Sequence, residues 1–210
     1  VPVTDILPWR EDFRREMACQ IVHDSLHDRT GWTQSYLLAS GGVAVGYGAV
    51  AIGGPWQGTK TVFEFYLAPS HHGQAFDFFE AFLQAGATTH FEFQTSATLL
   101  TSLAHVWSQN LRSEHIVFHD RLATRLPANG SRLSRASPDS VAKLFTHRHE
   151  PIGDWLLELD GTIIATGGVL DHYNPPYGDI YMEVAEPYRR RGFGAYLVQE
   201  LKRISRETGM

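Results

Sequence analysis

The sequence predicts an α/β protein built from two consecutive units that follow the same plan. Short apolar runs of strand length alternate with longer segments whose apolar residues recur at helical spacing. The segment 126–135 interrupts this alternation with Pro, Asn, Gly and Ser and has no periodicity, as is typical of a linker. The order of elements then begins again. We therefore expect a first domain at 1–126, a linker at 127–136 and a second domain at 137–210.

The first half alternates helix and strand signals. A helix is predicted over residues 11–26, because its apolar residues recur at helical spacing. Two apolar runs at 36–38 and 43–52 are separated by Gly41-Gly42, which is a hairpin turn signal. The remaining elements expected in this half are strands at 62–67, 90–93 and 116–118 and helices at 72–83 and 97–108.

The second half repeats this order. Ser137-Pro138-Asp139 predicts the start of a helix that runs to Thr146, since Pro favours the first turn. Asp160-Gly161 predicts a tight hairpin turn between two strands. The other elements expected here are strands at 155–159, 162–166 and 180–185, a loop at 174–178 and a helix at 192–205.

A gapless overlay of the two halves supports a duplication. Gly73 and Gly192 differ by 119 positions (192 − 73 = 119). The same offset pairs identical residues at turns, strand starts and the turn from strand to helix: Leu37 with Leu156, Leu38 with Leu157, Gly42 with Gly161, Gly48 with Gly167, Val50 with Val169 and Glu64 with Glu183. A repeat of this length predicts two tandem domains and not a solenoid.

Charge and composition exclude several classes of function. The net charge of −5 argues against a nucleic-acid-binding protein, which carries a basic excess. The single cysteine, Cys19, excludes an intrachain disulfide and a cysteine-rich zinc site, and we expect it inside the first helix as a buried apolar side chain. No apolar run approaches the roughly 18 residues that cross a membrane, and no signal peptide is visible. We therefore expect a cytoplasmic protein with no membrane partner.

The segment 180–197 carries the strongest chemical signal. It reads as a strand, a sharp turn with Gly192 and Gly194, and a helix. Unpaired amides at a helix start and the helix dipole together form an anion site. Arginines add charge-assisted hydrogen bonds to phosphate. We call residues 184–195 the elbow and predict that it binds a pyrophosphate.

Other nucleotide sites do not fit the elbow. The dinucleotide pattern G-x-G-x-x-G lacks its third glycine here, and the P-loop pattern G-x-x-x-x-G-K-[ST] is absent. A basic helix start with no ligand remains the alternative. Three arginines at a helix N-terminus oppose the dipole, which an anion at this place would explain.

The elbow resembles the acetyl-CoA signature of the GNAT superfamily of N-acetyltransferases. That signature is a strand ending in V-x-P, followed by [R/Q]-x-x-G-x-[G/A] at the start of a helix. The matching residues here are Ala185, Glu186 and Pro187 at the strand end and Arg189, Gly192 and Gly194 in the loop. Pro187 lies one residue closer to Arg189 than in the usual signature. The resemblance covers about 137–208 well and, through the repeat, extends more weakly to 1–125.

The resemblance implies a fold, a cosubstrate and its binding residues. The fold is a mixed α/β sheet that splays open after its fourth strand, in two tandem GNAT-like domains of which the second is incomplete. Acetyl-CoA would be the cosubstrate, and its acetyl group would pass to an amine of a small-molecule or peptide acceptor. The backbone of Val184, Ala185 and Glu186 would bind the pantetheine arm and polarise the thioester. The pyrophosphate would lie on Arg189 and the amides of Arg190, Arg191, Gly192, Phe193, Gly194 and Ala195.

The resemblance also implies a general base, because the attacking amine has to be neutral. A carboxylate early in the fourth strand has this role in several family members, and Asp179 falls at that place once the shortening at Pro187 is allowed for. Glu183 is the second candidate, and strand alternation puts both on the face of Tyr181. The alternatives stay open: Asp179 as a solvated loop-end acid, and Glu183 as a structural residue, since Glu64 has the same repeat position.

The first half reads as a degenerate copy that has lost CoA binding. Ser70 stands where the arginine is expected, followed by His71 and His72, which are poor phosphate anchors when neutral. Its helix at 76–82 is unusually aromatic, which fits either core packing or one face of a substrate pocket or domain contact.

Three further expectations concern metals, hydrolysis and completeness. His147 and His149 invite a metal site, but no further ligand is in register, so we expect no metal. A serine-hydrolase elbow, G-x-S-x-G, is absent. The family fold needs elements beyond Met210, so we expect a longer natural chain or a cleaved product; a true truncation would expose a sheet edge and favour a homodimer. The competing hypothesis is a non-catalytic CoA-binding or protein-interaction module.

Overall fold

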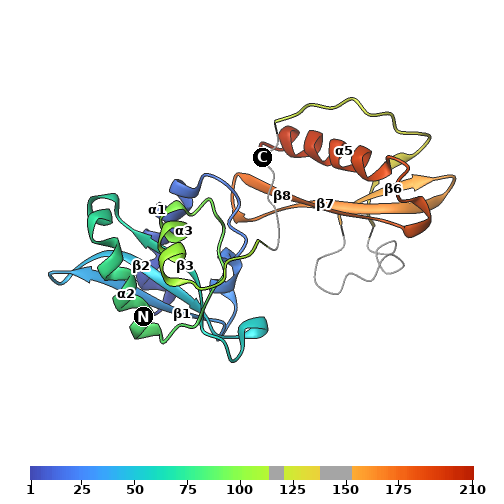
Figure 1. Cartoon of the computed structure of the whole chain (residues 1–210). Coiled ribbons are helices and arrows are strands. Elements are labelled where there is room, and N and C mark those ends of the chain that lie inside the picture. The colour runs from blue at the N-terminus through green and yellow to red at the C-terminus, as the bar shows by residue number, and fades with distance from the viewer. Residues whose placement is uncertain (114–120, 138–152) are drawn as a thin grey trace. The chain divides into compact units, whose positions relative to one another are not determined.

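The computed structural model describes residues 1–113, 121–137 and 153–210, without the side chains of 171–173. The chain divides into two compact units, Val1–Ile116 and Val117–Met210. Figure 1 shows each unit as a sheet with helical elements packed on it, α1, α2 and α3 in the first unit and α5 in the second. The expected strand at 116–118, the expected helix from Pro138 to Thr146 and the pair His147 and His149 lie outside the described residues.

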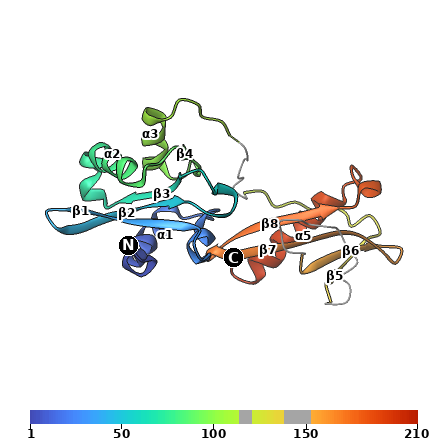
Figure 2. The ribbon, with the colours of Figure 1, turned by 90° about the horizontal axis from the view of Figure 1, so that it is seen from below.

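The first unit contains a four-stranded sheet in the order β1-β2-β3-β4. Its strands are β1 (Thr33–Ser40), β2 (Val43–Ala51), β3 (Thr61–Leu67) and β4 (His90–Phe91), and its helices are α1 (Leu7–Met17), α2 (Ala75–Gly86) and α3 (Thr98–Trp107). The 3₁₀ turns are η1 (Val3–Ile6), η2 (Asp24–Asp28), η3 (Gly54–Trp56) and η4 (Pro69–Gln74). Figure 2 shows α1 on one face of the sheet and α2 and α3 on the other.

The sheet of the first unit opens between β3 and β4. β1, β2 and β3 pair antiparallel, whereas β4 pairs parallel with β3 only at Thr61↔His90 and Val62↔Phe91. Past Val62, β3 therefore has no strand on this side among the described residues. Both faces of β3 are nevertheless covered, and all seven of its residues are buried.

The aromatic helix α2 belongs to the core of the first unit. Phe79 and Phe82 are fully buried, and the rings of Phe65 and Phe79 meet edge to face with centroids 4.9 Å apart. Phe76 is exposed and lies on Trp107. Core packing, rather than the wall of a substrate pocket, accounts for the two buried rings of this helix.

The first helix is displaced from its predicted range of 11–26. α1 begins at Leu7, with Pro8 in its first turn, and ends at Met17 because Ala18 adopts the left-handed conformation (φ 46°) that closes a helix. The apolar residues at Ile21 and Leu26 continue the spacing but pack from a loop and a 3₁₀ turn. Cys19 therefore lies beyond the helix and is half-buried, which corrects its expected place in a helix interior.

The second unit contains the sheet β5-β6-β7-β8, antiparallel throughout. Its elements are β5 (Arg132–Arg135), β6 (Trp155–Leu159), β7 (Thr162–Asn174), β8 (Tyr177–Val184), η5 (Glu186–Tyr188) and α5 (Phe193–Glu207). β5 falls inside the segment expected to be a linker, so that expectation is wrong at 132–135. The turn that suggested a linker is present, with Asn129 and Gly130 at positive φ, but it leads directly into a strand that pairs with β6.

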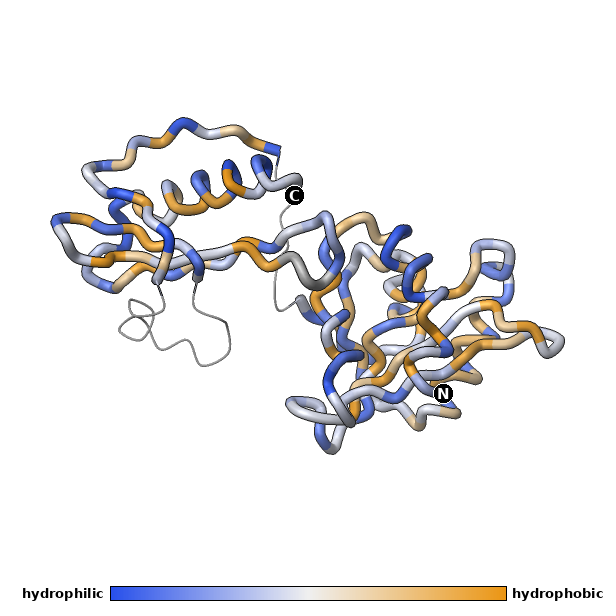
Figure 3. Tube along the Cα trace, turned by 180° about the vertical axis from the view of Figure 1, so that it is seen from behind, coloured by the Kyte–Doolittle hydropathy of each residue, from blue (hydrophilic) through white to orange (hydrophobic). Residues whose placement is uncertain are grey.

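Helix α5 covers one face of this sheet. Phe193, Leu197 and Leu201 recur every four residues and are buried against β7 and β8. Figure 3 shows the apolar side of α5 facing the sheet and its polar side facing away. This spacing is the clearest helix signal in the sequence, and the predicted range of 192–205 is close to the observed one.

The expected equivalence of Glu64 and Glu183 is wrong. Glu64 pairs with Ala49 on β2. If Glu183 were the counterpart of Glu64 at an offset of 119, it would pair with the counterpart of Ala49, which is Gly168. Glu183 instead pairs with Thr166. The offset of 119 that holds for the first hairpin becomes 117 at the next strand, and the register counterpart of Glu183 is Tyr66. The interpretation of Glu183 as a structural residue, which relied on its equivalence to Glu64, is therefore no longer supported by the repeat.

Candidate functional site

The elbow joins β8 to α5 through a left-handed turn. The Ala185 amide still donates to Ile164 O on β7 at 2.9 Å, and a 3₁₀ turn follows. Arg190 and Gly192 both have positive φ, 63° and 86°. Glycine adopts this conformation without the steric cost of a Cβ atom, so Gly192 is suited to the position immediately before the helix.

The elbow presents a run of unpaired backbone amides. The first intrahelical bond of α5 runs from the Tyr196 amide to Gly192 O at 3.0 Å. Within the described residues, the amides from Arg190 to Ala195 donate to no other group outside the helix. The first-turn amides of a helix also lack partners inside it and carry the positive end of its dipole. An anion is the ligand that such a turn accepts.

The three arginines of the elbow lie in three different settings. The Arg189 Nε donates to Val184 O at 2.9 Å, and its Nη2 lies 3.9 Å from Glu183 Oε1. Arg191 lies over the rings of Tyr188 and Phe193, at 5.5 and 5.4 Å from their centroids. Arg190 is exposed and contacts no polar or aromatic side chain of the described chain. Arg190 is therefore the guanidinium best placed to meet a ligand from solution.

Gly194 allows α5 to approach β8 closely. A Cβ atom at this position would lie 3.3 Å from both Met182 Cε and Val184 Cγ2, which is tighter than ordinary packing. The helix start is thereby held against the end of β8. Phe193 anchors it further, because its ring is buried in the core of the second unit.

The two candidate bases lie on β8, on the face opposite α5. Met182 and Val184 are the side chains next to Gly194 of α5, so alternation directs Glu183, Tyr181 and Asp179 to the other face. Asp179 is exposed and pairs with Leu170. The Glu183 side chain is 30% exposed and shares the ion pair with Arg189. The two carboxylates are four residues apart, about 13 Å along a strand, so they are separate groups and not a pair.

The corresponding turn of the first unit has a different chemistry. β3 ends as β8 does: the Ala68 amide donates to Val45 O on the neighbouring strand, and Ala68 has φ −53° and ψ 138° against −55° and 135° for Ala185. Ser70 bonds to the ring of His71, and His72 Nε2 lies 2.8 Å from Leu67 O. No residue from Pro69 to Gln74 has positive φ.

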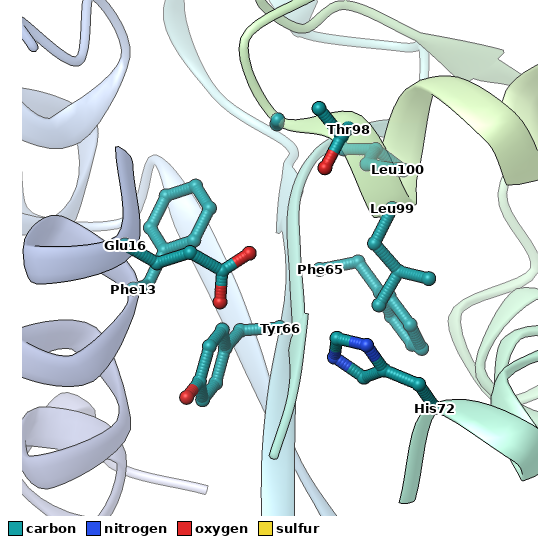
Figure 4. Close-up of a pocket in the computed structure, with 9 residues that line it drawn as sticks. Phe13, Glu16, Phe65, Tyr66, His72, Thr98, Leu99 and Leu100 are labelled. Carbon is teal, nitrogen blue, oxygen red and sulfur yellow. The ribbon is translucent and has the colours of Figure 1, made fainter. Parts of the chain in front are cut away.

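A small hollow lies at the open edge of β3. Figure 4 shows Phe65, Leu99 and His72 on one side of this strand and Phe13, Glu16 and Tyr66 on the other. The remaining void holds about one water molecule. The hollow therefore marks where the sheet opens, but its side chains fill most of the space.

A buried polar network in the first unit escaped sequence reasoning. Glu64 is 1% exposed, and its Oε2 accepts hydrogen bonds from the Tyr47 hydroxyl at 2.7 Å and from His27 Nε2 at 2.8 Å. Nearby, buried Asp24 forms ion pairs with Arg10, at 2.9 Å, and with Arg14. These residues come from four separate elements, and no motif joins them.

The network sets the charge state of its members. Burial alone would raise the pKa of Glu64, but the hydrogen bonds and charges of His27, Tyr47 and Arg10 outweigh it and lower that pKa. Burial and the neighbouring Glu64 carboxylate raise the pKa of Tyr47 well above its usual value. Glu64 is thus an ionised, structural carboxylate of the core and has no access to a ligand.

The family comparison concerns the unit that carries the elbow. Residues 119–210 match the acetyltransferase (GNAT) family. The match includes all of β8, the elbow and α5. No curated protein matches the chain. Acyl transfer is therefore supported as the general activity of this domain.

The fold of the whole chain is similar to a solved GNAT structure. An acetyltransferase of the GNAT family from Colwellia psychrerythraea superposes with a TM-score of 0.65 at 13% sequence identity, covering 96% of this chain and 83% of that one. At this identity the likeness concerns the fold. The mixed α/β GNAT fold predicted from the sequence is confirmed at that level.

The described residues were also compared with two expectations from the sequence, that there is no metal site and no membrane-spanning segment. The described residues contain no group of three or more His, Cys, Asp or Glu side chains arranged to hold a metal ion. Among the same residues, no helix is both long and apolar enough to cross a membrane.

Proposed function

We propose that this protein is an N-acetyltransferase that binds acetyl-CoA at the elbow and transfers the acetyl group to an amine. The observation that carries the proposal is the run of free amides from Arg190 to Ala195, next to the unengaged guanidinium of Arg190. The family match over residues 119–210 supports the same assignment. The pyrophosphate lies on these amides, and the exposed arginines add charge-assisted hydrogen bonds.

The pantetheine arm runs along the outer edge of β8, with which no strand pairs among the described residues, at Val184 and Glu186. The amide and the carbonyl of Ala185 are both bonded within the chain, to Ile164 O and by the Tyr188 amide, so Ala185 contributes only its position. Because the Ala185 amide is bonded to β7, alternation turns the Val184 carbonyl toward the open edge. The amine attacks the thioester carbonyl, its nitrogen loses a proton, and CoA leaves as the thiol. Glu183 is the preferred base, since it lies nearer to the elbow than Asp179 does.

The residues before the family match form, in our proposal, a first GNAT-like domain that has lost CoA binding. Its sheet has three antiparallel strands followed by a turn whose first residue, Ala68, matches Ala185 in conformation. Left-handed residues are absent from that turn, and its histidines bond to the chain itself. We place the boundary between the two proposed domains where the chain divides into its compact units, Val1–Ile116 and Val117–Met210.

A second candidate function is CoA binding without transfer. The ion pair between Glu183 and Arg189 favours it, because the carboxylate proposed as the base already contacts a side chain of the elbow. Binding and turnover separate the two candidates.

The test is calorimetric titration of acetyl-CoA into the wild type and into Gly192→Glu, followed by an assay of CoA thiol release with a panel of amines. Binding that is lost in the variant, together with turnover, supports transfer. Binding without turnover on any amine favours the second candidate. A wild type that binds no acetyl-CoA contradicts both.

A further inference from the structure

The carbonyl at the end of β8 is already occupied by a side chain of the elbow itself. Val184 O faces the outer edge of β8, with which no strand pairs in the described part of the chain, and an extended ligand would join the sheet at this edge. Arg189 Nε donates to this oxygen at 2.9 Å. A guanidinium in that position stands where the first hydrogen-bonding group of an added strand would lie.

A second contact holds the same guanidinium. Arg189 Nη2 lies 3.9 Å from Glu183 Oε1, and the Arg189 side chain is 54% exposed. The ion pair is thus weak and open to solvent, and a stronger anion can draw the guanidinium away. The diphosphate that the proposed function places on the amides of the same turn carries such a charge.

The neighbouring arginine shows that this contact is specific to one position. Arg190 has the same charge and belongs to the same turn, yet it is exposed, and it forms no hydrogen bond or ion pair with β8. The first unit has a similar contact from a different side chain, because His72 Nε2 lies 2.8 Å from Leu67 O, the last carbonyl of β3.

We infer that Arg189 is a specificity-determining residue that closes the edge of β8 to pantetheine-like ligands lacking a diphosphate. The inference rests on the proposed function. A neutral ligand has to compete with the guanidinium for Val184 O and cannot attract it elsewhere. Acetyl-CoA carries the anion that draws Arg189 off the strand, and its binding both frees the carbonyl and separates Arg189 from Glu183.

The test compares two ligands on the full 210-residue chain. Dissociation constants of acetyl-CoA and of S-acetylpantetheine, which has no phosphate, are measured for the wild type, Arg189→Ala and the control Arg190→Ala. Loss of one charged hydrogen bond predicts about three- to tenfold tighter S-acetylpantetheine binding in Arg189→Ala. Arg190→Ala weakens acetyl-CoA binding and leaves S-acetylpantetheine unchanged.

A second variant and an NMR signal distinguish the loss of the Arg189 contact from misfolding of a variant. Arg189→Lys keeps the charge but lacks the Nε donor, and it is expected to admit S-acetylpantetheine as Arg189→Ala does. In the wild type, the NMR signal of the Arg189 Nε–H is expected to be protected from solvent and to shift when acetyl-CoA is added.

The outcomes separate the two proposals. A wild type that binds acetyl-CoA, with S-acetylpantetheine affinity equal in all variants, overturns the role of Arg189 and leaves the proposed function standing. An unprotected Nε–H signal overturns it as well. A wild type that binds no acetyl-CoA overturns the proposed function and this inference together.

Discussion

At the residue scale, two glutamates on comparable strands have opposite surroundings. Glu64 lies in the core between Tyr47 and His27, whereas Glu183 lies at the surface beside Arg189. A buried charge that loses its partners is costly, while an exposed ion pair contributes little. The two residues therefore differ in setting: Glu64 stabilises the fold from within the core, whereas Glu183 belongs to a partly exposed ion pair beside the elbow.

This difference predicts opposite effects of the same substitution. Glu64→Gln is expected to lower the free energy of unfolding by about 3 kcal/mol, because it removes the charge that His27 and the nearby arginines compensate. Glu183→Gln is the matched control and is expected to change that free energy by less than about 0.5 kcal/mol. Urea denaturation measures both, and equal losses would contradict the assignment.

Glu64 also predicts how stability depends on pH. Its pKa is lower in the folded chain than in the unfolded chain, so between these two pKa values the folded chain binds fewer protons than the unfolded chain does. Its contribution is complete above the unfolded carboxyl pKa of about 4.3 and is lost as pH falls through the lower folded value. Urea midpoints measured from pH 7 to pH 3 should fall less steeply in Glu64→Gln than in the wild type. Parallel curves would refute this prediction.

At the element scale, the elbow depends on a left-handed residue before α5. Gly192→Ala places a Cβ at φ 86°, at a cost of about 1–2 kcal/mol, and the turn can relieve this strain only by moving its amides. We expect acetyl-CoA affinity to fall at least tenfold. Calorimetric titration measures the loss.

The hairpin turn between β6 and β7 offers a matched control for this change. Gly161 has φ 75° and open space around its Cβ position, so Gly161→Ala brings similar strain at a distance from the elbow. It should lower stability by a comparable amount and leave acetyl-CoA affinity unchanged. Equal affinity losses in both variants would mean that strain alone, and not the elbow geometry, reduces binding.

Sequence patterns located elements better than their ends. The four-residue spacing of Phe193, Leu197 and Leu201 gave α5 almost in full, and Asp160-Gly161 gave its hairpin turn. The first helix was misplaced because Ile21 and Leu26 maintain an apolar spacing beyond Ala18, where the backbone has already turned. Strand β5 was missed because a four-residue strand after a Gly turn has too few residues to show alternation.

The chemistry of the elbow was predictable for the same local reason. Its glycines, arginines and helix start are consecutive in the sequence, so one motif contains the whole arrangement. The contact from Arg189 to Val184 O depends on a side-chain conformation and could not be read from the motif. The network around Glu64 joins residues up to 54 positions apart in the chain (64 − 10 = 54), between Arg10 and Glu64, and only folding brings them together.

At the scale of the whole molecule, each unit has a hydrophobic core of its own. The first core includes Phe65 and Phe79, and the second includes Leu197 and Leu201. Chains with separate cores commonly unfold in more than one step. The molecule is therefore expected to show two transitions in scanning calorimetry.

Core variants and ligand assign these transitions. Leu201→Ala is expected to cost about 2–5 kcal/mol and to lower one transition, and Phe79→Ala is expected to lower the other. Saturating acetyl-CoA should raise only the transition that Leu201→Ala lowers, because a ligand stabilises the unit that binds it. A single transition affected by both variants would show that the units unfold together.

The outer edge of β8, with which no strand pairs among the described residues, has a consequence for solubility. A long open strand is a template on which strands of other molecules can add, and such growth leads to aggregates. β8 carries acidic side chains at Asp179 and Glu183, and the guanidinium of Arg189 occupies its last outward carbonyl. These charges disfavour the approach of a neutral strand. A chain with all three replaced by neutral residues would begin to precipitate at concentrations where the native protein stays dissolved, long before its fold is lost.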